Sequence, residues 1–159
     1  MKGLPHEWLI AGLENSAKIL DLALADVSQE QARTARDGDD GWTVLEVLCH
    51  LRDYQDIFAD RIRRMLEEEA PEFRLYDESA RLALVIDNDY ANQDLRAVLD
   101  QYRVRRRWLV ERLSAAPESD WLCEGRFAAD DVVDVEMAVV HTLLHDATHT
   151  EQIARVLKR

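Results

Sequence analysis

Three histidines near the carboxyl end of the chain, His141, His145 and His149, follow one another at intervals of four residues. On a helix this interval places side chains on one face, about 6 Å apart along the axis, so two imidazoles can bind the same metal ion. Asp146 follows His145, where a HExxH metalloprotease has its glutamate base, so that chemistry does not apply. The spacing alone is weak evidence for a metal, because exposed or hydrogen-bonded histidines share it.

A fourth histidine, His50, lies on a stretch that is otherwise apolar, and a single core histidine is the alternative interpretation. Whether His50 reaches the pair His145 and His149 depends on the direction of the two helices. If they are antiparallel, His50 lies about 10 Å from the start of its helix and His149 about 15 Å from the end of the chain, so the depths agree within about a turn. If they are parallel, His50 lies roughly 12 to 15 Å away from the pair and the three share no ion.

The elements that must position these histidines are four long amphipathic helices. Only five Gly and three Pro interrupt the 159 residues, and apolar residues recur at helical spacing. A capping box of Thr43 and Glu46 predicts the start of the second helix, and Asn92 is a plausible N-cap for the third. The predicted helices run from His6 to Val27, from Thr43 to Glu69, from Asn92 to a point before Pro117, and from near Asp131 almost to the C-terminus.

The connection over residues 71–91 is too long for a tight helical hairpin, and it has room for a short helix over residues 79–86. A crossover there makes the second helix parallel to the third and antiparallel to the fourth, in an up-down-down-up order. We therefore predict an all-α protein, a four-helix bundle with a long crossover between its second and third helices. One such domain is expected to cover residues 1–159.

The charge balance argues against a nucleic-acid partner. The formal net charge is −12 and the pI is near 4.8, so the protein repels a phosphate backbone. The basic run 103–107 fits a solvated helix face. No signal peptide or apolar run of about 18 residues is visible, which predicts a cytoplasmic protein without a membrane partner. Cys49 and Cys123 lack CxxC spacing and are expected to be reduced and partly buried.

Two segments resemble a known family, the DinB-like or YfiT-like metal-binding four-helix bundles. The segment 41–51 is similar to the family's Trp-Thr/Ser start of the second helix that leads to a histidine, and the segment 145–153 is similar to its HDxxHxxQI motif. The resemblance spans nearly the whole chain. It implies that one divalent metal ion is bound by His50, His145 and His149. His141 matches no ligand position, and we expect it in the core or beside the ligands rather than as a fourth ligand.

Three neutral imidazoles leave one position open for water or substrate, as in catalytic zinc sites. All-nitrogen ligation suits Zn(II) best and Ni(II) next. Asp53, one turn after His50, and Asp146 are candidates to orient an imidazole. No catalytic residue is assigned.

The resemblance implies two classes of enzyme: S-transferases and isomerases that use a low-molecular-weight thiol, and hydrolases. In both, a metal lowers the pKa of a nucleophile that attacks a small-molecule substrate. No further base is evident at a motif position, which favours the thiol. The alternative is a non-catalytic, stress-related metal-binding or interaction protein. A homodimer is an open expectation, and Trp8, Trp108 and Trp121 are expected to pack in the core rather than in an interface.

Overall fold

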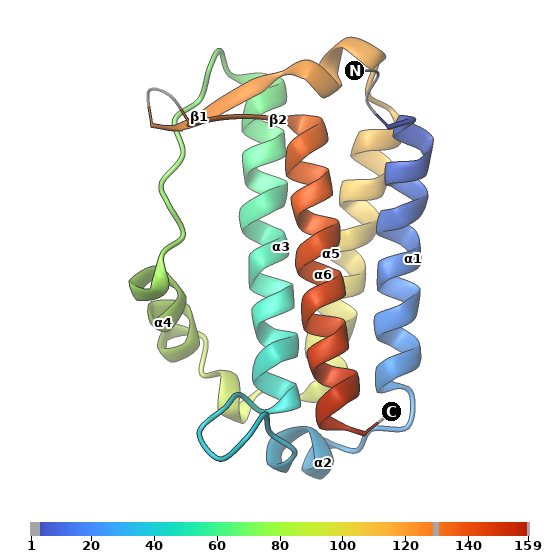
Figure 1. Cartoon of the computed structure of the whole chain (residues 1–159), viewed down its shortest axis with the longest axis vertical. Helices are drawn as coiled ribbons and strands as arrows, with labels where there is room; N and C mark the ends of the chain where they lie inside the picture. The colour runs from blue at the N-terminus through green and yellow to red at the C-terminus, as the bar shows by residue number, and fades with distance from the viewer. Residues whose placement is uncertain (1–3, 129–130, 159) are drawn as a thin grey trace.

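Four long helices run side by side in the computed structural model, which describes residues 4–128 and 131–158 (Figure 1). They are α1 (His6–Leu24), α3 (Val44–Glu67), α5 (Leu95–Ser114) and α6 (Val135–Val156). Figure 1 shows that α1 and α6 run in one direction while α3 and α5 run in the other. This is the up-down-down-up order, so the predicted four-helix bundle is confirmed and α3 is antiparallel to α6.

The crossover that makes α3 parallel to α5 runs from one end of the bundle to the other beside α3 (Figure 1). It contains α4 (Glu78–Asp87), close to the short helix that the sequence predicts, and one turn of 3-10 helix, Tyr90–Asn92. The N-cap of α5 is Asp94, whose side chain accepts a hydrogen bond from the N–H of Ala97, and not Asn92. Asn92 lies in the 3-10 turn, and its side chain donates to the Asp89 carboxylate, so it does not cap α5.

A small antiparallel hairpin precedes α6 where the sequence predicts only a polar connector and the start of a helix. Its strands are β1 (Glu124–Ala128) and β2 (Asp131–Asp134), and the 3-10 helix Glu118–Leu122 leads into it. The hairpin also bonds to the beginning of the crossover, since Phe73 N–H donates to the Arg126 carbonyl over 2.6 Å. Asp134 caps α6, which therefore begins at Val135 and not near Asp131.

A short helix, α2 (Gln29–Thr34), lies between α1 and α3 and begins with a capping box of Ser28 and Gln31. The predicted first helix, which extends to Val27, ends at Leu24 for this reason. Val27 is nevertheless buried, at 1% exposure, so its apolar character reflects packing rather than helix.

The core consists of two apolar clusters, one toward each end of the bundle, with a polar layer between them. One cluster contains Leu20, Leu51 and Tyr102, and the other contains Leu13, Phe58 and Leu109. The layer has one residue from each long helix, and its members are Ser16, Gln55, Arg106 and Asp146. Arg106 donates to the other three over 2.7 to 2.9 Å.

The tryptophans expected in the core, Trp8, Trp108 and Trp121, have different environments. Trp121 is buried and stacks on His6, with ring centroids 4.0 Å apart. Trp8 is 66% exposed and Trp108 is 42% exposed, so the expectation that these two pack in the core is wrong. Both lie on outward faces of their helices, which the apolar periodicity alone does not distinguish from inward ones. Among the described residues, no helix is long and apolar enough to cross a membrane.

Candidate metal centre

The start of α3 fixes the position of His50. Thr43 Oγ1 accepts a hydrogen bond from the N–H of Glu46 over 3.2 Å, and Glu46 Oε2 accepts from the N–H of Thr43 over 2.7 Å. This capping box, predicted from the sequence, places His50 in the second turn of the helix. The Trp42 ring packs edge-on against the imidazole, with centroids 5.1 Å apart. His50 is only 4% exposed.

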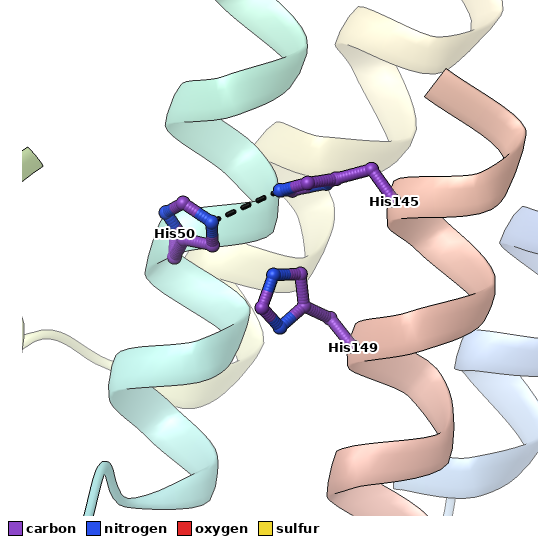
Figure 2. A group of neighbouring side chains, drawn as sticks. All are labelled: His50, His145 and His149. Carbon is purple, nitrogen blue, oxygen red and sulfur yellow. Dashed lines mark hydrogen bonds between the residues drawn. The ribbon is translucent and has the colours of Figure 1, made fainter. Parts of the chain in front are cut away.

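His145 and His149 face His50 from α6, one turn apart on the same side of the helix (Figure 2). The Nε2 atoms of His50 and His145 are 3.0 Å apart. Each of the three side chains offers a ring nitrogen within 4.8 Å of the other two. Zn–N bonds of about 2.0–2.1 Å in a tetrahedral site place two ligand nitrogens about 3.3 Å apart, so the shortest separation is close to that of a metal site.

The imidazoles are held in the neutral form that binds metal. Burial, with smaller contributions from the neighbouring His149 and Arg81, lowers the pKa of His50 to about 3. Burial likewise lowers the pKa of His145 to about 2, with smaller effects from the neighbouring histidines. The pKa of His149 is also lowered by burial. At neutral pH the three rings therefore carry no charge that would repel a cation.

A chain of hydrogen bonds orients His149. Its Nδ1 lies 2.8 Å from Oε1 of Gln152, so Nδ1–H donates and Nε2 is left to bind a metal. Gln152 Nε2 in turn donates to Asp37, over 3.0 Å, and Asp37 also pairs with Arg155. Gln152 was assigned no role from the sequence, although its position three residues after His149 predicts a neighbour on the same helix face.

Asp53 and Asp146 were expected to orient an imidazole, and neither does so. The Asp53 carboxylate accepts hydrogen bonds from Arg52, Asn88 and Tyr90, over 2.7 to 2.8 Å. Asp146 points into the polar layer between the two core clusters. Their chemistry as carboxylates fitted the role, but the direction of each side chain from its helix did not.

His141 lies outside the group of three histidines, and it is exposed rather than part of the core. Its ring meets the edge of Phe58, with centroids 5.2 Å apart. Tyr54 occupies the place beside His145 instead and stacks on it, with centroids 3.7 Å apart and ring planes inclined by 17°. Tyr54 follows His50 by four residues on α3, so the two side chains lie on the same face of that helix.

Cys49 is buried beside His50 in the chain, and burial raises the pKa of its thiol to about 12. The thiol is therefore protonated at neutral pH and is not an activated nucleophile. Cys123, the other cysteine, is partly buried and also free of a disulfide.

A pocket of about 330 Å³, which we call the histidine pocket, lies in front of the three imidazoles. Its remaining walls are Tyr54 and four residues of the crossover, namely Tyr76, Asp77, Glu78 and Arg81. The Arg81 guanidinium lies 4.9 Å above the Trp42 ring and contacts Glu78 over 3.4 Å. The crossover therefore has a second role besides reversing the chain direction, because it covers the site. Its length was evident in the sequence, but the residues that it brings to the pocket were not.

Three comparisons with known proteins agree with this arrangement. The family model described as the DinB superfamily matches residues 13–153. A protein of Geobacillus thermodenitrificans (strain NG80-2) named "Putative metal-dependent hydrolase" is 28% identical over 155 residues, which are 96% of this chain and 84% of that protein. YfiT from Bacillus subtilis, described as a probable metal-dependent hydrolase with an unusual four-helix bundle topology, superimposes with a TM-score of 0.85 at 23% identity, covering 100% of this chain and 89% of YfiT.

A mycothiol-dependent maleylpyruvate isomerase has the same fold over 63% of its own chain and 96% of this one, with a TM-score of 0.77 and 15% identity.

Proposed function

The chain belongs to the DinB superfamily, and from this premise we propose that it is a metal-dependent enzyme whose divalent ion is bound by His50, His145 and His149. The convergence of these three imidazoles on the wall of an open pocket carries the proposal. Three nitrogen ligands leave a position for a small molecule, which is typical of catalytic rather than structural zinc sites. The donor set suits Zn(II) first and Ni(II) next.

The chain's own residues prepare the ligands. Burial keeps the imidazoles neutral, Gln152 fixes the tautomer of His149, and Tyr54 holds the plane of His145 by stacking. A divalent ion in this site supplies Lewis acidity, which lowers the pKa of a water or thiol so that it reacts as a nucleophile at neutral pH.

Thiol transfer to an electrophilic small molecule is the first choice of reaction, and hydrolysis is the second. The two carboxylates of the histidine pocket already have partners, since Asp77 caps α4 through the Ala80 N–H and Glu78 contacts Arg81. A water nucleophile benefits from a nearby base, whereas a thiolate needs none. The names of the relatives point to both classes, a hydrolase and a thiol-dependent isomerase.

Metal content and affinity test the proposal directly. The purified parent should hold about one divalent ion per chain, and His50→Ala, His145→Ala and His149→Ala should each lose it while remaining helical. His141→Ala is the matched control, because His141 lies on the same helix outside the group of three, and it should bind like the parent. Three variants that bind metal as tightly as the parent would overturn the site.

Removal of the ion separates an enzyme from a non-catalytic metal-binding protein of stress responses. An open catalytic site predicts that a chelator leaves the helical fold intact and that the ion exchanges. The loaded protein should then consume a low-molecular-weight thiol in the presence of an electrophile, or hydrolyse an ester. A fold that is lost with the ion, without either reaction, would favour the non-catalytic alternative. The cytoplasmic location and the homodimer stay predictions.

A further inference from the structure

Arg61 on α3 is a buried cation that forms no ion pair with any carboxylate among residues 4–128 and 131–158. Only 8% of its surface is exposed. The other two buried arginines, Arg52 and Arg106, each bond to a buried carboxylate over 2.7 Å, on Asp53 and Asp146. Burying a charge without such a partner is costly. Arg61 is therefore the exception among the buried arginines of the described residues.

The surroundings of Arg61 are aromatic. Its guanidinium carbon lies 4.6 Å from the ring centre of Phe127, 5.6 Å from that of Phe58 and 5.9 Å from that of Phe73. Rings at these distances attract the cation, but they provide no oxygen acceptor for its N–H groups. The aromatic contacts thus explain how the charge is tolerated and leave its hydrogen-bonding capacity unused.

Most of the donors of the Arg61 guanidinium have no acceptor among residues 4–128 and 131–158. A guanidinium has five N–H donors, and one nitrogen of Arg61, Nη2, donates to the carbonyl oxygen of Arg74 over 3.0 Å. In the described chain, no nitrogen of Arg61 is both fully buried and without a hydrogen-bond partner. Its remaining N–H groups therefore open onto the space beside them rather than onto packed protein.

Arg61 lines a cavity of about 370 Å³, which we call the distal cavity, next to the histidine pocket. Tyr54 and Tyr76 line both, and His141, one turn before His145, lines the distal cavity. Arg61 follows His50 by eleven positions on the same helix, roughly 16 Å along its axis. The Arg61 side chain leans toward the N-terminal end of α3, over the ring of Phe58 one turn earlier.

We propose that Arg61 binds a carboxylate at the far end of an elongated substrate whose reacting end lies at the three histidines. This inference rests on the proposed metal site. The other walls of the distal cavity are mostly apolar and suit an uncharged linker; they include Leu75, Phe127, Val132 and Met137. Asp131 lines the same cavity without pairing with Arg61, and its charge disfavours a more highly charged group. A planar carboxylate matches the guanidinium through two parallel hydrogen bonds.

Bifunctional hydroxamates test the inference, because the hydroxamate binds the metal and a second group reaches along the cavity. The probes are the monohydroxamates of succinic, adipic and suberic acid, each compared with an alkyl hydroxamate of the same length that lacks the carboxylate. We expect the metal-loaded parent to bind one length of the carboxylate series about tenfold more tightly than its alkyl counterpart, as measured by calorimetry. Arg61→Gln should lose this preference and still bind the alkyl hydroxamate, whereas Arg61→Lys should keep part of it.

Arg63→Gln is the matched control, because Arg63 lies on the same helix but pairs with Asp60 and Glu67 at the surface. It should keep the preference of the parent. Equal binding of carboxylate and alkyl probes by the parent at every length would overturn the role of Arg61 and leave the metal site intact, even if Arg61→Gln fails to fold. If neither probe binds and no metal is retained, the proposed function itself fails, and the inference fails with it.

Discussion

At the scale of single residues, Gln152 determines which nitrogen of His149 is available to a metal. The hydrogen bond of 2.8 Å from Nδ1 to Gln152 Oε1 requires the proton on Nδ1, so Nε2 carries the lone pair. Gln152→Leu removes the acceptor while keeping a similar volume. We expect metal affinity to fall about 10- to 100-fold, the usual effect of losing such an orienting partner. Competition with a chromogenic chelator measures the change.

Gln152→Glu is the informative companion, since it restores an acceptor at the same position and should bind metal at least as tightly as the parent. Glu151→Gln serves as the control, because Glu151 is an exposed neighbour that pairs with Arg155. A Gln152→Leu variant with the affinity of the parent would show that packing alone orients His149.

The lowered histidine pKa values predict how the metal-free protein responds to acid. His50 and His145 have folded pKa values of about 3 and about 2, below the ordinary 6.5. As the pH falls below about 6.5, the histidines of the unfolded chain bind protons, whereas those of the folded protein do not. The free energy of unfolding is therefore highest above about pH 6.5 and decreases as the pH falls toward the pKa values of the folded protein. Each histidine contributes a slope of at most about 1.4 kcal/mol per pH unit.

Urea unfolding of the metal-free parent between about pH 6.5 and 4.5 measures this slope, and His145→Gln should reduce it by the contribution of one group. Asp53, whose pKa is lowered by its hydrogen bonds from Arg52, Tyr90 and Asn88 despite its burial, acts at lower pH. Burial raises the pKa of Asp56, but Asp56 is present in both proteins, so the difference between their slopes reports His145. Identical slopes in parent and variant would contradict the assignment of a neutral buried His145.

At the scale of elements, the start of α3 links helix stability to the site. Thr43→Ala removes one half of the capping box and should lower the free energy of unfolding by about 1 to 2 kcal/mol, because a buried N-cap leaves helix N–H groups without an acceptor. Urea unfolding checks this. Ser28→Ala makes the same change at the start of the short, exposed helix α2 and should cost less. An equal loss of unfolding free energy in both variants would mean that burial adds nothing to the contribution of the α3 cap.

The elements that sequence reasoning predicted are those with a local signal. The four long helices follow from apolar periodicity, and the start of α3 follows from Thr43 and Glu46, which bond only within one turn. The start of α5 was misplaced from Asp94 to Asn92, because both residues are good caps and only tertiary structure selects between them. The hairpin was missed because Val132 and Val133 fit the helix pattern that follows, and strand pairing is not local.

The same distinction explains how much of the candidate site was predicted. The grouping of His50, His145 and His149 was predicted from helical spacing, the bundle topology and the resemblance to the DinB-like family. Gln152 lay within the family-like motif but had no assigned role. Tyr76, Arg81 and the unpaired state of Arg61 depend on where the crossover and the hairpin lie against α3, and no spacing along the chain encodes that contact.

At the scale of the whole molecule, the polar layer connects all four long helices at one level. Arg106 on α5 reaches Ser16 on α1, Gln55 on α3 and Asp146 on α6. A buried pair of this kind contributes little net stability relative to apolar residues, but breaking one half leaves an unpaired charge. Because each partner lies at a fixed height on its helix, a register shift of any helix would separate them. We therefore expect the layer to select this register rather than to supply much of the folding energy.

A double-mutant cycle on Arg106 and Asp146 tests this interpretation. Arg106→Met and Asp146→Leu should each lower the free energy of unfolding by about 3 to 5 kcal/mol, because each leaves the other charge buried and alone. The double variant replaces both with apolar side chains, so it should be destabilised by clearly less than the sum of the single changes. It should also keep its metal, since Asp146 contacts the layer and not the imidazoles. Additive losses would show that the two charges are not coupled and that the helix register is set by the apolar clusters alone.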